Sequence, residues 1–220
     1  MLAKGEGIEH LAHILITSGP TRQYLDPVRY LSNASSGRMG AALAATAIEA
    51  GHQVTVVSGP VHVAYPSGAD VIRVVSTEEM LAACQKVFPA CNGLIAAAAP
   101  CDYRPADVAP NKIRKTGEPL RLELVETPDI VATLAATRTS QWIVAFALET
   151  EDRHARARQK LERKNCDLIV VDGPEAVNAV DTKVELLDRD GRVLGSFAGG
   201  KNDVAQEVFQ IIQQRLIDSV

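Results

Sequence analysis

The segment Ser32–Gly40, with the sequence SNASSGRMG, contains the side chains best suited to hold a charged ligand. It has three serines, one amide, two glycines and an arginine, and it leads into an alanine-rich stretch that favours a helix. The unpaired N–H groups and the positive dipole end of a helix N-terminus attract phosphate or carboxylate groups. Small hydroxyl residues are also common helix caps. The spacing alone therefore leaves a helix cap and an anion site both open.

A second candidate is a basic run in which Lys112, Arg114 and Lys115 fall within four residues. Prolines and Gly117 bracket this run and could act as hinges. One interpretation is a solvated basic loop. The other is a flap, at about 104–118, whose ammonium groups neutralise a triphosphate and its leaving group.

Three further side chains are candidates for polar contacts. Asp102 is a lone carboxylate after an apolar run, where it could orient a hydroxyl, hold a metal through water or cap a turn. Lys160 and Lys164 are four residues apart, so a helix would present them on one face, either to solvent or to one polyanion. The histidines and cysteines show no triad or zinc-ligand spacing. Chemistry through positioning and electrostatics is therefore expected, rather than covalent catalysis.

The elements that must position these residues follow from alternating apolar runs and helix-length segments. Strands are predicted at 13–17, 53–57, 71–75, 94–98, 120–125, 142–147 and 168–171, with a hairpin of 184–188 and 192–197. Helices are predicted at 38–50, 76–88, from 127, at 152–165 and at 202–217. This alternation predicts one α/β domain, 1–220, with a Rossmann-like, doubly wound, mostly parallel sheet, a C-terminal hairpin and a flap loop.

Such sheets bind ligands at the carboxyl ends of their strands. Four loops are predicted there, and they contain nearly all the unusual residues: 18–36, 58–66, 100–115 and 148–152.

Composition limits the function classes. The chain has 220 residues, 46% of them hydrophobic, with a net charge of −4, which argues against a broad nucleic-acid-binding surface. No apolar run approaches the roughly 18 residues needed to cross a bilayer, and no signal peptide is recognised. The four cysteines have no pairing pattern, so a cytoplasmic protein with reduced thiols is expected.

Several motifs in order resemble the phosphopantothenoylcysteine synthetase family of coenzyme A biosynthesis. They are ITSGPTRQYLDPVRYLSNASSGRMG, VVSGPV, AAAPCDYRPADVAPNKIRK, TPDIV, FALET and KLERKNCDLIVV, and they cover nearly the whole chain. The family is often fused behind a flavin-dependent decarboxylase, and this chain is expected to be the stand-alone form, with a separate decarboxylase as a further candidate partner.

The resemblance implies a ligase that joins 4′-phosphopantothenate to L-cysteine. The carboxylate attacks the α-phosphate of CTP with release of pyrophosphate, and cysteine then displaces CMP from the acyl-cytidylate. Mg²⁺ is expected with the triphosphate. The family is dimeric with the substrate site near the subunit interface, so a homodimer is expected.

The resemblance also assigns roles to individual residues. Asn33 matches the asparagine that contacts the acyl group, and Lys112 matches the flap lysine that acts on phosphate. Arg29, Ser35, Ser36 and Gly37 are assigned to the substrate. The remaining nucleotide-binding positions are Ala96, Ala97, Ala98, Asp102, Pro128, Asp129, Ile130, Val131, Phe146, Lys160 and Lys164.

Five positions depart from the family pattern: Arg114, in a flap that reads Lys-Ile-Arg-Lys where Lys-x-Lys-Lys is usual, and Pro100, Glu126, Asp172 and Lys183. They keep open an ATP-using ligase and a non-catalytic nucleotide-binding homologue. A dehydrogenase is disfavoured because no G-x-G-x-x-G follows the first strand and the second strand ends without an acidic residue.

Overall fold

A computed structural model describes residues 11–148, 152–173 and 181–219. Its centre is an eight-stranded sheet in the order β12-β11-β10-β9-β6-β1-β4-β5. These strands are β1 (His13–Ser18), β4 (Gln53–Ser58), β5 (Ala69–Arg73), β6 (Gly93–Ala96), β9 (Trp142–Leu148), β10 (Leu168–Asp172), β11 (Asp181–Asp188) and β12 (Val193–Gly200).

All pairings from β5 across to β10 are parallel, whereas β11 pairs antiparallel with both β10 and β12. This confirms the predicted α/β fold with its C-terminal hairpin. The strands that follow β1 first add on one side of it, as β4 and β5, and then on the other, as β6, β9 and β10. The strand order therefore reverses between β1 and β6, which is where ligands bind in sheets of this kind.

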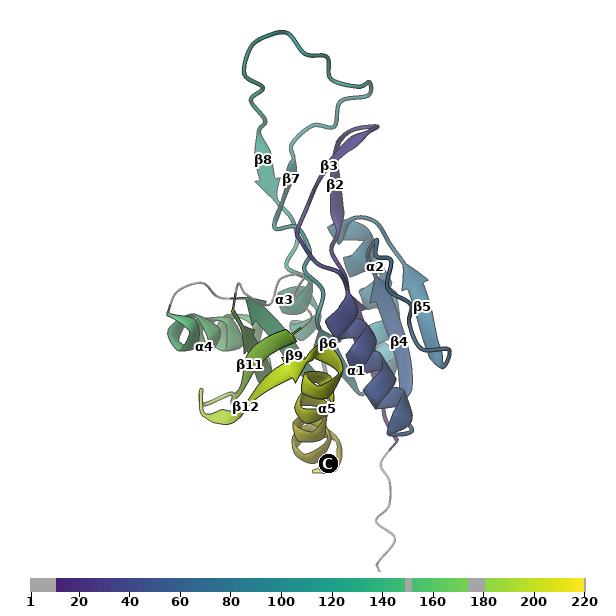
Figure 1. Ribbon diagram of the computed structural model, residues 1–220, viewed down its shortest axis with the longest axis vertical. Helices are drawn as coiled ribbons and strands as arrows, with labels where there is room; N and C mark the ends of the chain where they lie inside the picture. Colours follow the sequence, from purple (N-terminus) through teal and green to yellow (C-terminus); the bar gives the residue numbers. More distant parts are fainter. Residues whose placement is uncertain (1–10, 149–151, 174–180, 220) are drawn as a thin grey trace, which may run out of the picture.

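Helices cover both faces of the sheet (Figure 1). One face carries α1 (Arg38–Glu49) and α5 (Lys201–Ile212), which pack against Ile14 and Ile16 of β1. The other face carries α2 (Thr77–Val87), α3 (Ile130–Ala135) and α4 (Arg153–Lys164), packed around Leu15 and its neighbours. Successive residues of β1 thus serve opposite layers, and because both layers are apolar the strand is almost continuously hydrophobic.

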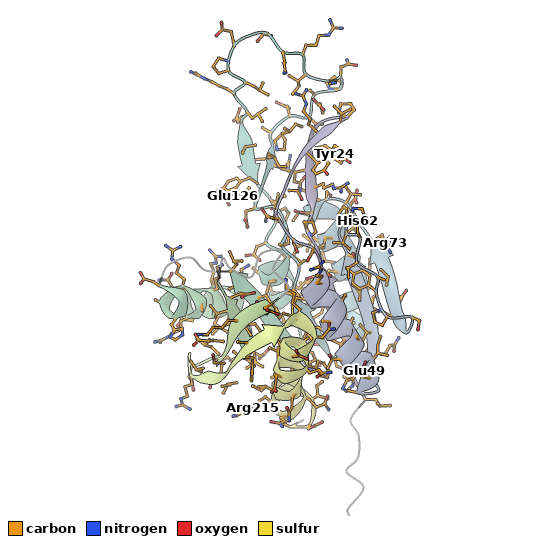
Figure 2. The ribbon with its side chains drawn as sticks, viewed as in Figure 1. Tyr24, Glu49, His62, Arg73, Glu126 and Arg215 are labelled. Carbon is orange, nitrogen blue, oxygen red and sulfur yellow. The ribbon has the colours of Figure 1, made fainter. Side chains whose placement is uncertain are left out.

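Two arms extend from the carboxyl edge of the sheet (Figure 1). The first is the antiparallel hairpin of β2 (Arg22–Asp26) and β3 (Arg29–Ser32), and the second pairs β7 (Tyr103–Pro105) with β8 (Leu124–Glu126). Figure 2 shows Tyr24 on the first arm and Glu126 on the second.

The structure corrects four sequence-based predictions, three of them on the arms. The segment 18–36 is not a loop throughout, because it contains the hairpin β2–β3. The strand predicted at 120–125 forms only at Leu124–Glu126, and the irregular segment after β6 contains β7. The strand predicted at 71–75 lies at Ala69–Arg73, since its residues pair with Val54–Ser58 of β4.

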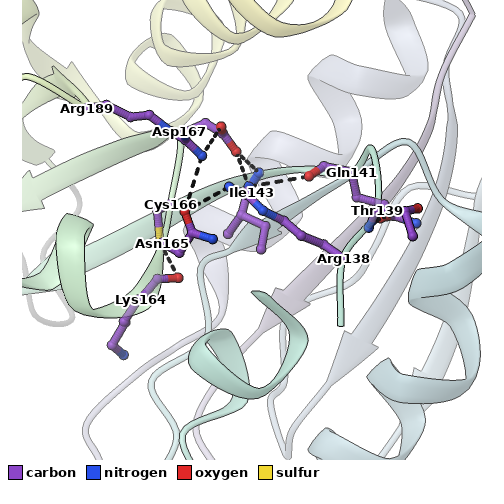
Figure 3. Close-up of polar contacts among 9 residues, drawn as sticks. All are labelled: Arg138, Thr139, Gln141, Ile143, Lys164, Asn165, Cys166, Asp167 and Arg189. Carbon is purple, nitrogen blue, oxygen red and sulfur yellow. Dashed lines mark hydrogen bonds and ion pairs between the residues drawn. The ribbon is translucent and has the colours of Figure 1, made fainter. Parts of the chain in front are cut away.

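A polar cluster lies at the amino ends of β9 and β10 (Figure 3). Asp167, just before β10, accepts a 2.7 Å hydrogen bond from the backbone N–H of Ile143 in β9. Its carboxylate also pairs with Arg138 at 2.6 Å and with Arg189 at 2.8 Å. The cluster therefore joins the start of two strands to the hairpin turn, and it is structural in character.

Candidate functional site

The loops after β1 and β6 meet where the strand order reverses. The N–H of Ala97 donates to the Thr17 carbonyl at 3.2 Å, and the N–H of Ala99 donates to the Gly19 carbonyl at 2.9 Å. Ala98 N–H also faces the Thr17 hydroxyl oxygen at 3.3 Å. Ala96 ends β6, so the predicted nucleotide-binding residues Ala96, Ala97 and Ala98 lie at the end of a central strand, held by the loop after β1.

Asn33 spans the two loops. Its side-chain amide donates to the Pro100 carbonyl at 2.8 Å and approaches the Ala99 carbonyl at 3.4 Å. Asn33 is exposed although it makes this contact. The structure thus brings Asn33 to Ala99 and Pro100, 66 and 67 residues further along the chain and directly after the 96–98 segment.

The start of α1 differs from the expected serine cap. The N-cap is Gly37, in a left-handed conformation with φ of 73°, and no side chain caps the helix. The Ser18 hydroxyl donates to the Gly37 carbonyl at 3.1 Å. A capping role for Ser35 or Ser36 is therefore wrong. Both side chains precede the helix half-exposed, which leaves their assignment to a ligand as a proposal.

A cavity of about 610 Å³ lies beside this helix start. Arg38, Ala41 and Ala45 of α1 form one wall, and Lys201 at the start of α5 forms another. The volume falls within the roughly 300–1,000 Å³ typical of small-molecule sites. Two helix N-termini and the cations Arg38 and Lys201 border this space, and the Asp203 carboxylate lines it as well, so the cavity is bordered by charges of both signs.

Lys201 lines this cavity, and the sequence analysis did not select it. Burial lowers the pKa of its ammonium group, the Asp172 carboxylate raises it and Arg38 lowers it, with a net decrease. Sequence offered only a weak signal, a lysine following a Gly-Gly pair before an amphipathic helix. Only the packing of α5 against α1 brings Lys201 to the cavity beside Arg38.

The flap predicted at about 104–118 extends between the strands of the second arm. From Ala106 to Glu123 it forms no helix or strand, and Lys112 is exposed on it. Ile113, the next residue, is held by the tip of the first arm. Its N–H donates to Asp26 Oδ2 at 3.1 Å, and its carbonyl accepts from Arg29 Nη2 at 2.6 Å.

Asp26 has no exposed surface and gathers five hydrogen bonds. Burial raises the pKa of its carboxyl group, but the hydrogen bonds from Val28, Arg29 and Ile113 lower the pKa by a larger amount. The net pKa therefore lies well below the ordinary range. Arg29 Nε and Nη2 both donate to Asp26 Oδ2, at 2.8 and 2.5 Å. The arginine assigned to the substrate by resemblance is thus engaged within its own chain.

The bases of the two arms are joined at α2. The Thr21 and Thr77 hydroxyls are 2.8 Å apart, and the Cys101 N–H donates to Thr21 Oγ1 at 2.8 Å. Asp102 follows and is exposed, with its carbonyl accepting from the Thr127 N–H at 2.9 Å. Asp102 therefore sits at the root of the flap, one residue before β7.

The nucleotide-binding positions predicted further along the chain begin just after Thr127, whose N–H donates to the Asp102 carbonyl at the root of the flap. Asp129 caps α3 by accepting from the Ala132 N–H, and its other oxygen pairs with Lys164 at 3.1 Å. The side chains of Ile130 and Val131 are buried among α2, α3 and α4. Pro128 is exposed just before them.

Phe146 lies in β9 and packs, half-buried, against the core on the α1 and α5 face. Lys160 and Lys164 lie one turn apart on α4, which covers the opposite face. The predicted nucleotide contacts thus come from both faces of the sheet. Part of the predicted loop at 148–152 lies outside the described residues, which exclude 149–151.

The departures from the family pattern have local explanations in part. The Pro100 carbonyl receives the Asn33 amide. Asp172 accepts from the Thr182 hydroxyl at 3.1 Å and from the Gly173 N–H at 3.0 Å, which closes the end of β10. Glu126 ends β8, and Lys183 is exposed on β11.

Among the described residues, no group of three or more His, Cys, Asp or Glu side chains is placed to hold a metal ion. Within the same part of the chain, no helix is long and apolar enough to span a membrane. The four cysteines are free thiols and all are buried.

With this geometry, the chain can be compared with known proteins. A family model described as the DNA/pantothenate metabolism flavoprotein C-terminal domain matches residues 10–216. The chain belongs to this family. Membership confirms the resemblance that the ordered motifs carried.

One relative and two solved structures are similar to this chain over most of its length. A Vibrio cholerae protein named Coenzyme A biosynthesis bifunctional protein CoaBC is 42% identical over 210 residues, covering 92% of this chain and 52% of the relative. The crystal structure of the C-terminal domain of a protein with the same name is 34% identical, with a TM-score of 0.80, and the match covers 94% of this chain and 96% of that one. A structure of Cab2 in complex with phosphopantothenate-cysteine shares the fold, with a TM-score of 0.75 at 16% identity, and covers 94% of this chain and 88% of that one.

The chain spans about half the length of the curated relatives that it matches. Those relatives are named for coenzyme A biosynthesis. The matched residues, 10–216, contain the loops after β1 and β6, Asn33 and the flap.

Proposed function

We propose that this chain is a ligase that joins 4′-phosphopantothenate to L-cysteine through an acyl-nucleotide intermediate. The observation that supports the proposal is the contact of Asn33 with Ala99 and Pro100, in the loop that follows the 96–98 segment at the switch point of a DFP-family sheet. The distant relative Cab2, whose structure holds phosphopantothenate-cysteine, gives the proposal a product of the right chemistry.

The first step brings two anions together. A carboxylate oxygen of phosphopantothenate forms a bond to the α-phosphorus, and the bond from that phosphorus to the pyrophosphate oxygen breaks. The exposed Lys112 ammonium would neutralise the charge that develops on the departing pyrophosphate. Arg38 and Lys201 at the cavity are proposed to hold further phosphate oxygens.

In the second step, the amine nitrogen of cysteine attacks the acyl carbon, the bond from carbon to the phosphate oxygen breaks, and the nitrogen loses a proton. Asn33 is proposed to donate its amide hydrogen to the acyl oxygen, whose negative charge grows during this attack. The same amide now donates to the Pro100 carbonyl, so the substrate would replace that contact.

CTP is the proposed cosubstrate, with Mg²⁺ bound to its phosphates. Mg²⁺ usually keeps several waters and binds substrate phosphates plus one or two carboxylates, and Asp102 at the root of the flap is the candidate carboxylate. The ion would screen the triphosphate from the incoming carboxylate. Phe146 offers an apolar ring to a base, and Lys160 with Lys164 offers charge to the nucleotide. The buried thiols agree with a reducing compartment, so we propose a cytoplasmic enzyme.

The test is pyrophosphate release from purified protein with 4′-phosphopantothenate, cysteine, Mg²⁺ and either CTP or ATP. Release that requires phosphopantothenate supports the ligase. Preference for ATP would correct only the nucleotide, and absence of release with both nucleotides would refute the ligase in favour of a non-catalytic homologue.

Replacement of Asn33 by Asp is the sharpest variant. A carboxylate cannot donate to the acyl oxygen and repels it, so we expect product formation to fall by about 10²–10³-fold. Nucleotide binding, measured by calorimetry, should change little. Asn92→Asp is the matched control, because that exposed amide lies at the amino edge and only accepts, from the His13 N–H. Full turnover in Asn33→Asp would remove Asn33 from the mechanism.

We also propose that the arms dimerise. They expose apolar side chains away from the body of the molecule, namely Tyr24, Val28, Tyr30, Tyr103, Leu122 and Leu124. Contiguous exposed apolar surface usually marks an interface, and a second copy is the occupant implied by the resemblance. Sedimentation equilibrium should give twice the chain mass, and Leu122→Asp with Leu124→Asp should halve it; a wild-type monomer at micromolar concentration would refute this interface.

A further inference from the structure

The first arm holds the flap at two residues, Ala109 and Ile113, and Ile113 is the residue next to Lys112. Within the described residues, only Ala109 and Ile113 join flap residues 107–122 by hydrogen bonds to another part of the chain. Ala109 N–H donates to the Leu25 carbonyl at 2.9 Å. Ile113 is bound on both its N–H and its carbonyl by the Asp26–Arg29 pair.

The pair is built to be rigid. The Asp26 side chain accepts from the N–H groups of Val28 and Arg29, both at 2.9 Å, so the carboxylate is fixed within its own turn. Its second oxygen receives two donors of the Arg29 guanidinium, which fixes the arginine fork. Both functional groups that hold Ile113 are therefore immobile before the flap contacts them.

We propose that Asp26 and Arg29 are positioning residues that set the place of Lys112 through the backbone of Ile113. This inference rests on the proposed function, in which Lys112 acts on the departing pyrophosphate. The Ile113 backbone is one peptide bond from Lys112, so a displacement of one residue is passed directly to the other. Because the flap is held next to Lys112, the Lys112 ammonium group is kept within a narrow range of positions. The remainder of the segment stays free to follow a substrate.

The role is distinct from that of a substrate ligand. The carboxylate of Asp26 is fully buried and contacts its own chain through every hydrogen bond that it makes. A structural role for the hairpin alone would not require the pair to bind the flap as well. Positioning of the flap therefore makes a prediction that a purely structural role does not.

The test is Asp26→Asn, with Asp107→Asn as the matched control. Asp107 is an exposed flap carboxylate, and its replacement removes the same charge without a contact to the first arm. In Asp26→Asn, the N–H groups of the new side-chain amide would face the donors of Arg29 and Ile113 and could not accept from them. The flap should therefore detach from the first arm. We expect faster trypsin cleavage after Lys112, Arg114 and Lys115, and a fall in kcat of about 100-fold for pyrophosphate release, with little change in KM for cysteine.

A double-mutant comparison separates positioning from stability. If Asp26 acts through Lys112, Asp26→Asn should lower kcat strongly in wild type but hardly at all in a Lys112→Gln background. Additive losses, or unchanged trypsin resistance in Asp26→Asn, would overturn the proposal. If Asp26→Asn does not fold, Arg29→Lys carries the same test, because it keeps the charge and removes the fork that reaches the Ile113 carbonyl.

The trypsin measurement needs no activity. Suppose that the wild-type protein releases no pyrophosphate but that Asp26→Asn is cleaved faster in the flap. This result would support the attachment of the flap and refute the ligase. Wild-type turnover with equal cleavage in both proteins would support the ligase and refute the attachment.

Discussion

Gly40 is the point at which α1 comes closest to β1, and its replacement by Ala tests how the helix start is positioned. A Cβ at Gly40 would lie 2.3 Å from Ser18 Oγ, 2.6 Å from Ser18 Cβ and 3.3 Å from Ser18 Cα. Ordinary contacts between carbon atoms are about 3.5–4.0 Å. The helix must therefore move from the strand by about 1 Å, because Ser18 is fully buried in a central strand and cannot turn aside.

Two effects oppose each other in Gly40→Ala. Overpacking of this kind costs about 1–3 kcal/mol. The higher helix propensity of Ala returns up to about 1 kcal/mol, and less in the first turn than in the middle of a helix. We expect the packing cost to dominate, with a net loss of roughly 1–2 kcal/mol in the free energy of unfolding. For a chain of this size, that loss lowers Tm by about 3–6 °C.

The assay is thermal and urea unfolding of Gly40→Ala beside two companions. Gly68→Ala is the control, since its added Cβ would meet only the Ile48 side chain, at 3.1 Å. Ser18→Gly removes the obstructing atoms, so the double variant should be more stable than the sum of the single changes predicts, by about 1 kcal/mol or more. A Gly40→Ala protein as stable as wild type, or strict additivity with Ser18→Gly, would show that the close approach does not constrain the helix.

Two further predictions separate structure from chemistry. Asp167→Asn removes the charge that holds Arg138, Arg189 and the Ile143 N–H, and should lower the free energy of unfolding by about 1–3 kcal/mol while the kcat of the folded protein stays unchanged, as chemical unfolding and steady-state assays would show. Burial raises the pKa of Cys84 to about 12, of Cys91 to about 11 and of Cys166 to about 12. A thiol reagent at pH 8 should therefore leave these three unmodified in the native protein and label all four cysteines in guanidinium; rapid native labelling would contradict their placement.

The sheet could be predicted from sequence because its central strands are buried on two faces and its last two strands are paired in a hairpin. Runs such as HILIT and QVTVV are mostly apolar, with only short polar residues or an end position breaking the run, and a strand between two helical layers favours this composition. The turn Arg189-Asp190-Gly191 likewise identified the C-terminal hairpin, with Gly191 at φ of 77°.

The arms could not be predicted in the same way. β2 and β3 are short and half-exposed, so their side chains follow no alternation that burial would impose. β7 and β8 are three residues each and pair across about twenty residues of irregular chain, and no local signal specifies such a pairing. Their existence depends on contacts at α2, such as those of Thr21 and Thr77, that sequence order does not reveal.

The segment SNASSGRMG shows the limit most clearly. Its residue types indicated a helix start next to a ligand site, and α1 does begin there. The expected cap was wrong because a left-handed residue is needed where the chain enters the helix, and glycine adopts φ of 73° without the strain that serine would incur. The hydroxyl groups of Ser35 and Ser36 therefore do not accept hydrogen bonds from the backbone N–H groups at the start of α1, as the hydroxyl of a capping serine would.

The glycine cap connects the local structure to the proposed chemistry. A serine that caps a helix uses its oxygen on that helix, whereas Ser35 and Ser36 stand before an N-terminus that no side chain caps. The N–H groups at the start of α1 are therefore available to a phosphate, and the hydroxyl groups are available beside them. Asn33 lies three residues before Ser36. Its side-chain amide donates to the Pro100 carbonyl, in the loop that follows β6. The glycine cap thus brings onto one short segment the helix-start N–H groups, which can bind an anion, and the Asn33 amide, which is proposed to bind the acyl group of a ligand that also carries a phosphate.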